Sequence, residues 1–294
     1  MKCAGVVVLY NPDKTILKNI ETYIDDLDVL YIIDNTPKKN NNEMFKNINK
    51  IKYISNNDNL GIATALNIGA KKAISDNYKW LLTMDQDSKF QKGDVAKMLN
   101  YIISLNKNEM IKDISGFDIK KLAILSPYHV TVNKQTESIE KKGFEKSLVV
   151  MTSGNIINLS IYKKIGGFKD WFFIDAVDFD YCLNLKKHKY EIVTLNYIKL
   201  KHNLGDITKT NFLGKTIYNL NHNYIRRYYV VRNRLYLNKI YKKDFPWYCK
   251  AQLRLSVKEM IKVLLFEKEK LKKIRYMIKG YIDYFTGKSG KLMK

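Results

Sequence analysis

The sequence predicts an α/β fold in which helices cover both faces of a mainly parallel sheet. Two observations predict it: apolar runs of strand type alternate with helical patterns, and polar breakers divide them. The strand-type runs cover residues 4–10, 29–33, 51–54 and 80–84, and helical patterns follow at 16–24 and 61–75. Helices between strands favour parallel pairing, because the chain must cross over before it returns in the same direction.

Each element has its own start or stop signal. The first strand ends at the breaker Asn11-Pro12-Asp13, and Asp13 is suited to cap the helix that follows. Further along, we expect helices at 92–105, 161–165 and 179–187, and strands at 122–127, 147–152 and 191–195. After about Gly214 helical patterns dominate and the charge becomes more basic. We therefore predict an α/β domain over residues 1–213 and a helical, basic region over residues 214–294.

The composition points to an anionic partner and a reducing compartment. The 294 residues include 52 Lys and Arg against 29 Asp and Glu, a formal net charge of +23. Such an excess is typical of proteins that meet nucleic acid, a membrane surface or a phosphorylated substrate. The three cysteines are scattered and form no disulfide framework. Because signal-peptide features and long apolar spans are missing from the sequence, we expect a cytoplasmic protein.

Two carboxylates end the fourth apolar run. Asp85 and Asp87 follow it directly, and alternate strand positions share a face. Converging carboxylates repel each other unless a cation lies between them, and hard divalent ions prefer oxygen ligands. An Asp-x-Asp pair alone is a weak signal, since such pairs are common in turns and helix caps. The pair is therefore a candidate metal site for a diphosphate, to be weighed with its neighbours.

Polar motifs follow each of the first four predicted strands. They are Tyr10-Asn11-Pro12, Asp34-Asn35, the segment 57–61 and Asp85-Gln86-Asp87. The carboxyl ends of parallel strands lie at one edge, so these motifs are expected to line a single crevice. There, Asp34 is placed to accept hydrogen bonds from a base or ribose. Gly61 opens a helix whose N-terminus favours phosphate. Any one motif alone is better explained as a turn; four in order are not.

These motifs resemble a known family. The early ones read Val-Val-Leu-Tyr-Asn-Pro, Ile-Ile-Asp-Asn, Asn-Asp-Asn-Leu-Gly-Ile-Ala-Thr-Ala-Leu-Asn-Ile-Gly and Met-Asp-Gln-Asp-Ser, and later ones lie at 166–183, 201–205 and 226–233. Together they resemble family 2 glycosyltransferases with the GT-A fold, a Rossmann-like, mainly parallel mixed sheet, and among these the bacterial rhamnosyltransferases. The resemblance covers residues 3–235, most of the chain.

The resemblance implies an inverting transfer from a nucleotide-diphospho-sugar to an acceptor hydroxyl. The diphosphate leaves as an anion, so a divalent cation, Mg²⁺ or Mn²⁺, is expected to offset its charge. Asp87 would ligate the metal directly, and Asp85 would lie near the ribose or reach the metal through water. His202 is either structural or, as we favour, a third metal or diphosphate contact. The implied nucleotide-sugar contacts are Tyr10, Asn11, Asp34, Asn35, Asn59, Gly61, Ala65, Asp85, Gln86 and Asp87.

Single displacement also needs a base within reach of the acceptor hydroxyl. By its position in the family motif, Asp178 is the predicted catalytic base. The family usually has Glu-Asp here, whereas this chain has Val177-Asp178 and so lacks one supporting carboxylate. Asp180 can equally be an ordinary charge at a helix N-terminus.

The acceptor or diphosphate side is expected to include Trp171, Asp175, Arg232 and Asn233. Arginine forks bind phosphates, and aromatic rings give sugars a flat surface. Each has a plainer alternative. Trp171 can belong to the core, Asp175 can shape the loop, and Arg232 can lie on a solvated helix face.

The C-terminal region is basic and amphipathic. Residues 239–294 hold 16 Lys and Arg against 5 Asp and Glu. Either its helices pack on the catalytic domain, or they attach the protein peripherally to the anionic inner face of the plasma membrane, as we favour.

The leading hypothesis is a metal-dependent transferase that moves rhamnose from dTDP-rhamnose to a lipid-linked glycan of a bacterial surface polysaccharide. Alternative donors are UDP-galactofuranose, UDP-glucose or a UDP-hexosamine. A different class, a basic nucleic-acid-binding protein, finds no supporting motif in the sequence. A catalytically silent scaffold is disfavoured because Asp85, Asp87 and Asp178 are all present.

Overall fold

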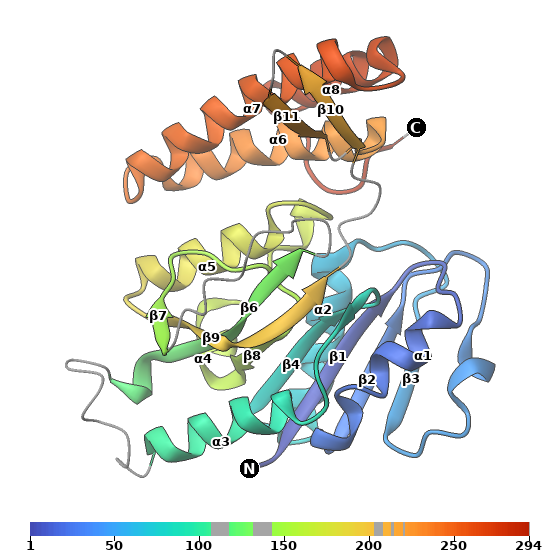
Figure 1. The fold of residues 1–294 in the computed structure, drawn as a ribbon, viewed down its shortest axis with the longest axis vertical. Helices are drawn as coiled ribbons and strands as arrows, with labels where there is room; N and C mark the ends of the chain where they lie inside the picture. The colour runs from blue at the N-terminus through green and yellow to red at the C-terminus, as the bar shows by residue number, and fades with distance from the viewer. Residues whose placement is uncertain (107–117, 132–142, 203–207, 213–214, 220, 294) are drawn as a thin grey trace.

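The computed structural model describes residues 1–106, 118–131, 143–202, 208–212, 215–219 and 221–293 (Figure 1). Its main sheet has the strand order β3-β2-β1-β4-β8-β6-β9-β5, and β7 pairs with β9. The first four strands in sequence are β1 (Cys3–Leu9), β2 (Val29–Asp34), β3 (Ile51–Ser55) and β4 (Trp80–Asp85). They pair in parallel, as the sequence predicts, so their carboxyl ends share one edge.

The second half of the sheet is mixed. It consists of β5 (Ser88–Lys89), β6 (Leu122–Thr131), β7 (Phe144–Lys146), β8 (Asn155–Asn158) and β9 (Glu191–His202). Strand β8 runs antiparallel to both β4 and β6, whereas β6 and β9 are parallel. The short strands β5 and β7 pair antiparallel with β9. The predicted α/β architecture with a mainly parallel sheet is therefore confirmed.

Helices cover both faces of this sheet. They are α1 (Thr15–Ile20), α2 (Ile62–Ser75), α3 (Asp94–Asn106), α4 (Leu159–Ile165) and α5 (Val177–Lys187), with 3₁₀ turns η1 (Ile24–Asp26), η2 (Asn42–Phe45), η4 (Ile119–Lys121) and η5 (Asp170–Phe172). One buried cluster joins the sheet to α2, α4 and α5, and a second joins the opposite face to α1 and α3. Alternate residues of β1 enter the two clusters: Val6 belongs to the first and Val7 to the second. This burial on both faces explains the continuous apolar runs in the sequence.

The C-terminal region forms a layer beyond the carboxyl edge of the sheet (Figure 1). It contains the hairpin β10 (Thr208–Phe212) and β11 (Lys215–Asn219), and the helices α6 (Tyr224–Tyr241), α7 (Pro246–Phe266) and α8 (Lys270–Phe285). Val231, Val263 and Met277 form the buried centre of the three helices. The predicted domain boundary at 213/214 lies outside the described residues and stays a prediction. None of the described helices combines the length and apolarity that crossing a bilayer requires.

A short segment after α8 ties this layer to the α/β part. The Gly290 amide donates to the Trp171 carbonyl at 2.7 Å, and the Gly290 carbonyl accepts from Arg232 at 2.9 Å. Beyond it, Lys291 pairs with Asp58 at 2.8 Å. The chain therefore returns from its last helix to the rim of the sheet.

One sequence prediction about elements is wrong, and one hairpin was not predicted. The expected strand at 147–152 is not one, because β7 ends at Lys146 and β8 begins at Asn155. Leu148, Val149 and Val150 instead pack as half-buried side chains on the core, which accounts for their apolar character. The hairpin of β10 and β11 was also not expected in a region where helical patterns dominate.

Candidate active site

Asp85 and Asp87 lie at the predicted edge of the sheet. Asp85 is the last residue of β4, opposite Val8 of β1, and its amide donates to the Ser153 hydroxyl at 3.0 Å. Asp87 directly precedes β5, in which Ser88 pairs with His202 of β9. The backbone of His202 therefore lies next to the acidic pair. The His202 side chain and residues 203–205 of the same motif lie outside what the structure describes.

Asp178 lies in the first turn of α5, and its side chain is half-buried. Burial raises the pKa of its carboxyl to about 7, and repulsion from Asp175 and Asp85 adds to this effect. A hydrogen bond from the Phe179 amide at 2.9 Å acts in the opposite direction. Electrostatic repulsion weakens with distance, so the contribution of Asp85, the smallest of these causes, indicates that the two carboxylates are not far apart. The structure thus brings together two acids that the sequence separates widely.

The loop before Asp178 has an unusual backbone. Phe173, Asp175 and Ala176 have φ values of 66°, 61° and 65°, although none is glycine. Such left-handed conformations cost about 1–3 kcal/mol each and persist only where the surroundings hold them. Here the Asn233 amide nitrogen lies 2.9 Å, 2.7 Å and 3.0 Å from the carbonyl oxygens of Phe172, Ile174 and Asp175. Residues 172–176, the base loop, are therefore held from α6.

Gly61 supports the same loop from the other side. Its φ is +84°, and a Cβ there would lie 2.5 Å from the Phe173 carbonyl oxygen. The amide of Ile62, in the first turn of α2, donates to that oxygen at 2.7 Å. The sequence places a ligand near this glycine and this helix start, but the neighbour in the structure is the base loop. Asn59 holds the turn, because its side-chain oxygen accepts from the Gly61 amide at 3.0 Å.

The other polar motifs join the strand ends to one another. The Tyr10 amide donates to the Gln86 side chain at 2.9 Å, which links β1 to the acidic turn. The Asn11 amide donates to Thr36 at 2.8 Å. The Asn35 side chain donates to the Gly61 carbonyl at 3.0 Å, which links β2 to the start of α2. The predicted crevice edge is therefore one connected rim.

Two of the residues predicted to contact the nucleotide-sugar have no exposed surface. Asp34 accepts hydrogen bonds from the Thr36 amide, the Asn41 side chain and the Tyr53 hydroxyl at 2.6–2.8 Å. Ala65 packs in the core cluster of α2. Both are fully buried, so Asp34 organises the rim from beneath and Ala65 fills the core. A direct contact of either residue with a ligand stays a prediction.

The predicted site-facing pair Arg232–Asn233 is also buried. The Arg232 guanidinium lies 5.1 Å and 5.0 Å from the ring centroids of Tyr228 and Tyr229. The pair therefore lies behind the base loop and does not line a surface. The arginine that does reach this loop is Arg226, which donates to Asp175 at 3.3 Å and is exposed. Residue type alone did not distinguish these arginines, because all of them occur in the same helical segment.

Asp180 and Ser153 have supporting positions. Asp180 is buried and pairs with Lys169 at 2.6 Å, and the Tyr241 hydroxyl donates to it at 2.9 Å. These contacts hold Asp180 in place in the first turn of α5, and whether it also has a direct functional role stays a prediction. Ser153, which orients Asp85, was not predicted; its only sequence signal is the turn Ser153-Gly154-Asn155 before β8.

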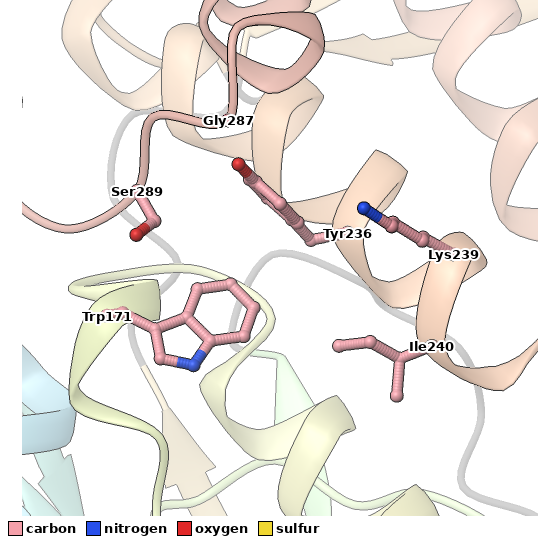
Figure 2. A pocket seen from close by; sticks show the side chains of 6 residues that line it. All are labelled: Trp171, Tyr236, Lys239, Ile240, Gly287 and Ser289. Atoms are coloured by element: carbon pink, nitrogen blue, oxygen red, sulfur yellow. The ribbon is translucent and has the colours of Figure 1, made fainter.

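Trp171 lines an open pocket of about 490 Å³ between η5 and the C-terminal layer (Figure 2). Its ring stacks on Phe172 and meets the Tyr236 ring edge-on, with 5.2 Å between centroids. The other lining residues are Lys239, Ile240, Gly287 and Ser289. The indole is half-buried, so part of its surface is accessible to a ligand, and its contact with an acceptor stays a prediction.

Residues 6–165, more than half of the chain, match the family described as Glycosyl transferase family 2. The chain belongs to this family. It is thus a glycosyltransferase, as the sequence motifs predict. It is also 28% identical over 305 residues to a Shigella flexneri protein named "dTDP-rhamnosyl transferase RfbF", with 97% of this chain and 95% of that protein covered.

Two solved structures resemble it in fold. A crystal structure of GalNAc-T7 with UDP, GalNAc and Mn²⁺ has a TM-score of 0.53, 13% identity, and covers 72% of this chain. A crystal structure of Staphylococcus aureus TarS has a TM-score of 0.51, 14% identity, and covers 98% of this chain. This chain spans 44% of the length of each. The predicted GT-A fold is confirmed.

Proposed function

We propose that this protein transfers rhamnose from dTDP-rhamnose to an acceptor hydroxyl, with inversion at the anomeric carbon. The observation that carries the reaction type is the half-buried Asp178, whose pKa of about 7 responds to Asp85 at the edge of the sheet. The choice of donor is supported by the Shigella flexneri protein named as a dTDP-rhamnosyl transferase, which matches along almost its whole length. A UDP-sugar is the alternative donor, since the similar GalNAc-T7 structure contains UDP.

In this reaction the Asp178 carboxylate accepts the proton of the acceptor hydroxyl. The acceptor oxygen forms a bond to the anomeric carbon while the bond from that carbon to the diphosphate oxygen breaks. A base with a pKa near the working pH is both ionised in part and basic enough to take the proton. The base loop fixes the start of α5 and thereby the position of this carboxylate. Attack from the side opposite the diphosphate accounts for inversion.

A divalent cation fits the residues at this edge. Asp85 and Asp87 offer carboxylate oxygens, and the repulsion of Asp178 by Asp85 reflects a local excess of negative charge. Among the residues that the structure describes, no three His, Cys, Asp or Glu side chains lie close enough together to hold a metal ion. Asp87 would hold the metal, with Asp85 beside it and His202 as a third contact. Mn²⁺ or Mg²⁺, when bound, supplies charge that stabilises the departing diphosphate.

We infer that the acceptor is a lipid-linked glycan of a bacterial surface polysaccharide. The pocket of Trp171 and Tyr236 supports a carbohydrate acceptor, because aromatic faces and polar groups together suit sugars. Asp175, held by Arg226, is a further acid in the loop before Asp178 and is a candidate acceptor contact.

Calorimetric titration tests the donor and the metal. We expect dTDP to bind more tightly than UDP or GDP, and only when Mn²⁺ or Mg²⁺ is present. Asp87→Asn should abolish metal-dependent binding, whereas Asp178→Asn should keep it and lose transfer. Equal binding of all three nucleotides without metal would refute the donor and metal assignments. Unchanged turnover of Asp178→Asn would refute the base.

A further inference from the structure

The two last helices expose apolar side chains in regular rows. On α7 the row is Leu253, Val257, Ile261 and Leu264; on α8 it is Leu271, Ile278, Ile282 and Phe285. The spacing of three, four or seven residues places each row on one helix face. Leu271 is 88% exposed and Phe285 78%. Monomeric proteins scatter single apolar residues on their surfaces, but rows of this kind mark a surface that meets a partner.

Both rows border the same seam. Met260 and Val263 of α7 pack against Ile274 and Met277 of α8, together with α6. In each helix the exposed row borders these packed positions: Ile261 follows Met260, Leu264 follows Val263 and Ile278 follows Met277. Figure 1 shows α6 toward the sheet and α7 and α8 beyond it. We name the two rows and the basic residues beside them the outer face of α7 and α8.

Charge on these helices is sorted between the inner and outer sides. Residues 246–285 contain ten Lys and Arg but four Asp and Glu. Three of the four acids turn inward: Glu259 pairs with Arg234, Glu267 with Arg227, and Asp283 accepts from the Tyr228 hydroxyl. The exposed basic side chains of residues 246–285 are Lys250, Arg254, Lys258, Lys268, Lys270, Lys272 and Arg275. The fourth acid, Glu269, is exposed and pairs with Lys272 at 3.7 Å, so the outer face keeps a positive excess.

We propose that the outer face of α7 and α8 docks on the surface of an anionic lipid bilayer. Its apolar rows would enter the boundary between headgroups and acyl chains, while Lys and Arg meet lipid phosphates. A second copy of the chain fits less well, because two faces of the same positive sign would be pressed together. Nucleic acid would satisfy the charge but leave Leu271, Ile278 and Phe285 in water. This proposal is independent of the sugar donor.

Sedimentation of the full chain with lipid vesicles tests it. We expect binding to vesicles with about 30 mol% phosphatidylglycerol and little binding to pure phosphatidylcholine, with a clear loss at high salt. Removing Lys258 and Arg275 together, as Lys258→Gln and Arg275→Gln, should weaken binding about 25-fold, since each basic residue contributes about five-fold. Leu271→Ser with Phe285→Ser should weaken it at least ten-fold while the melting temperature stays unchanged.

Matched controls lie on the α/β part. Lys71→Gln with Lys163→Gln removes the same charge, and Tyr197→Ser removes an exposed aromatic ring, so both should bind vesicles as the native protein does. Equal loss in the charge control would show general electrostatic attraction and overturn the proposal. Full binding by Leu271→Ser with Phe285→Ser would also overturn it. The proposal would also be overturned if the native protein were a dimer and Leu271→Ser with Phe285→Ser converted it to a monomer.

Discussion

The hydrogen bonds from the Asn233 side chain to the base loop give the sharpest test of the site. The two N–H donors of this side chain serve three carbonyl oxygens of residues 172–175, and the side chain is fully buried. Each net hydrogen bond contributes about 0.5–1.5 kcal/mol, so Asn233→Ala should lower the free energy of unfolding by about 1–3 kcal/mol. The left-handed residues of the loop store comparable strain, which is released once these hydrogen bonds are lost.

A loop that relaxes moves Asp178 away from its position. If about 1.4–2.8 kcal/mol of positioning is lost, kcat falls about 10- to 100-fold. Donor binding should change little, because the strand ends that carry Asp85 and Asp87 are held separately. The assay measures kcat, the KM of the donor and the melting temperature. Asn233→Asp keeps the shape but turns the donors into acceptors, so it should be at least as damaging.

Asn238→Ala, on the same helix, is the matched control, because no hydrogen bond of its side chain to the base loop occurs among the described residues. If Asn233→Ala keeps native kcat while Asp178→Asn is inactive, the loop is not positioned from α6 and the reasoning fails.

The site leads to four further predictions. Gly61→Ala should lower the melting temperature far more than Gly93→Ala. Both glycines have φ above +80°, a conformation that costs alanine about 1–2 kcal/mol, but only at Gly61 would the added Cβ also collide with backbone atoms. A similar loss at both positions would contradict close docking of the base loop. The transfer rate should rise with pH and level off above about 7, because only the ionised form of Asp178 accepts a proton and burial raises its pKa from 3.8 to about 7. Between about pH 4 and 7 the folded protein keeps this proton while the unfolded chain loses it, so the contribution of Asp178 to folding stability falls as pH rises through this range. Asp85→Asn should lower the Asp178 pKa measured by carboxyl NMR in metal-free protein, and an unchanged value would place the two acids apart. Trp171→Ala should raise the KM of the acceptor and leave that of the donor unchanged, and the opposite pattern would remove Trp171 from the acceptor side.

Much of the fold could be predicted because its signals are local. The parallel strands β1, β2 and β4 are buried on both faces, so they read as unbroken apolar runs ended by polar residues. The segment 147–152 has the same apolar character but packs without a ladder, and a single sequence cannot distinguish the two cases.

The site was harder, because it depends on long-range contacts. A common site for Asp178 and Asp85 was implied only by the family motif, since no local pattern relates them. Arg232 and Asn233 were expected to face the site because they belong to a family-like segment and arginine forks bind phosphates. In the structure the rings of Tyr228 and Tyr229, one turn earlier on α6, lie against the guanidinium, and the Gly290 carbonyl of the chain beyond α8 accepts a hydrogen bond from it.

The return of residues 290–292 to the rim has a thermodynamic consequence. The same few residues hold Trp171, Arg232, Asp58 and the Tyr229 hydroxyl. If the helical layer melted, the base loop would lose its contacts with Asn233. If the sheet melted, residues 290–292 would lose their contacts with Asp58 and Trp171. Calorimetry should therefore record one cooperative heat-absorption peak instead of two, and trimming the chain before Gly290 should split it.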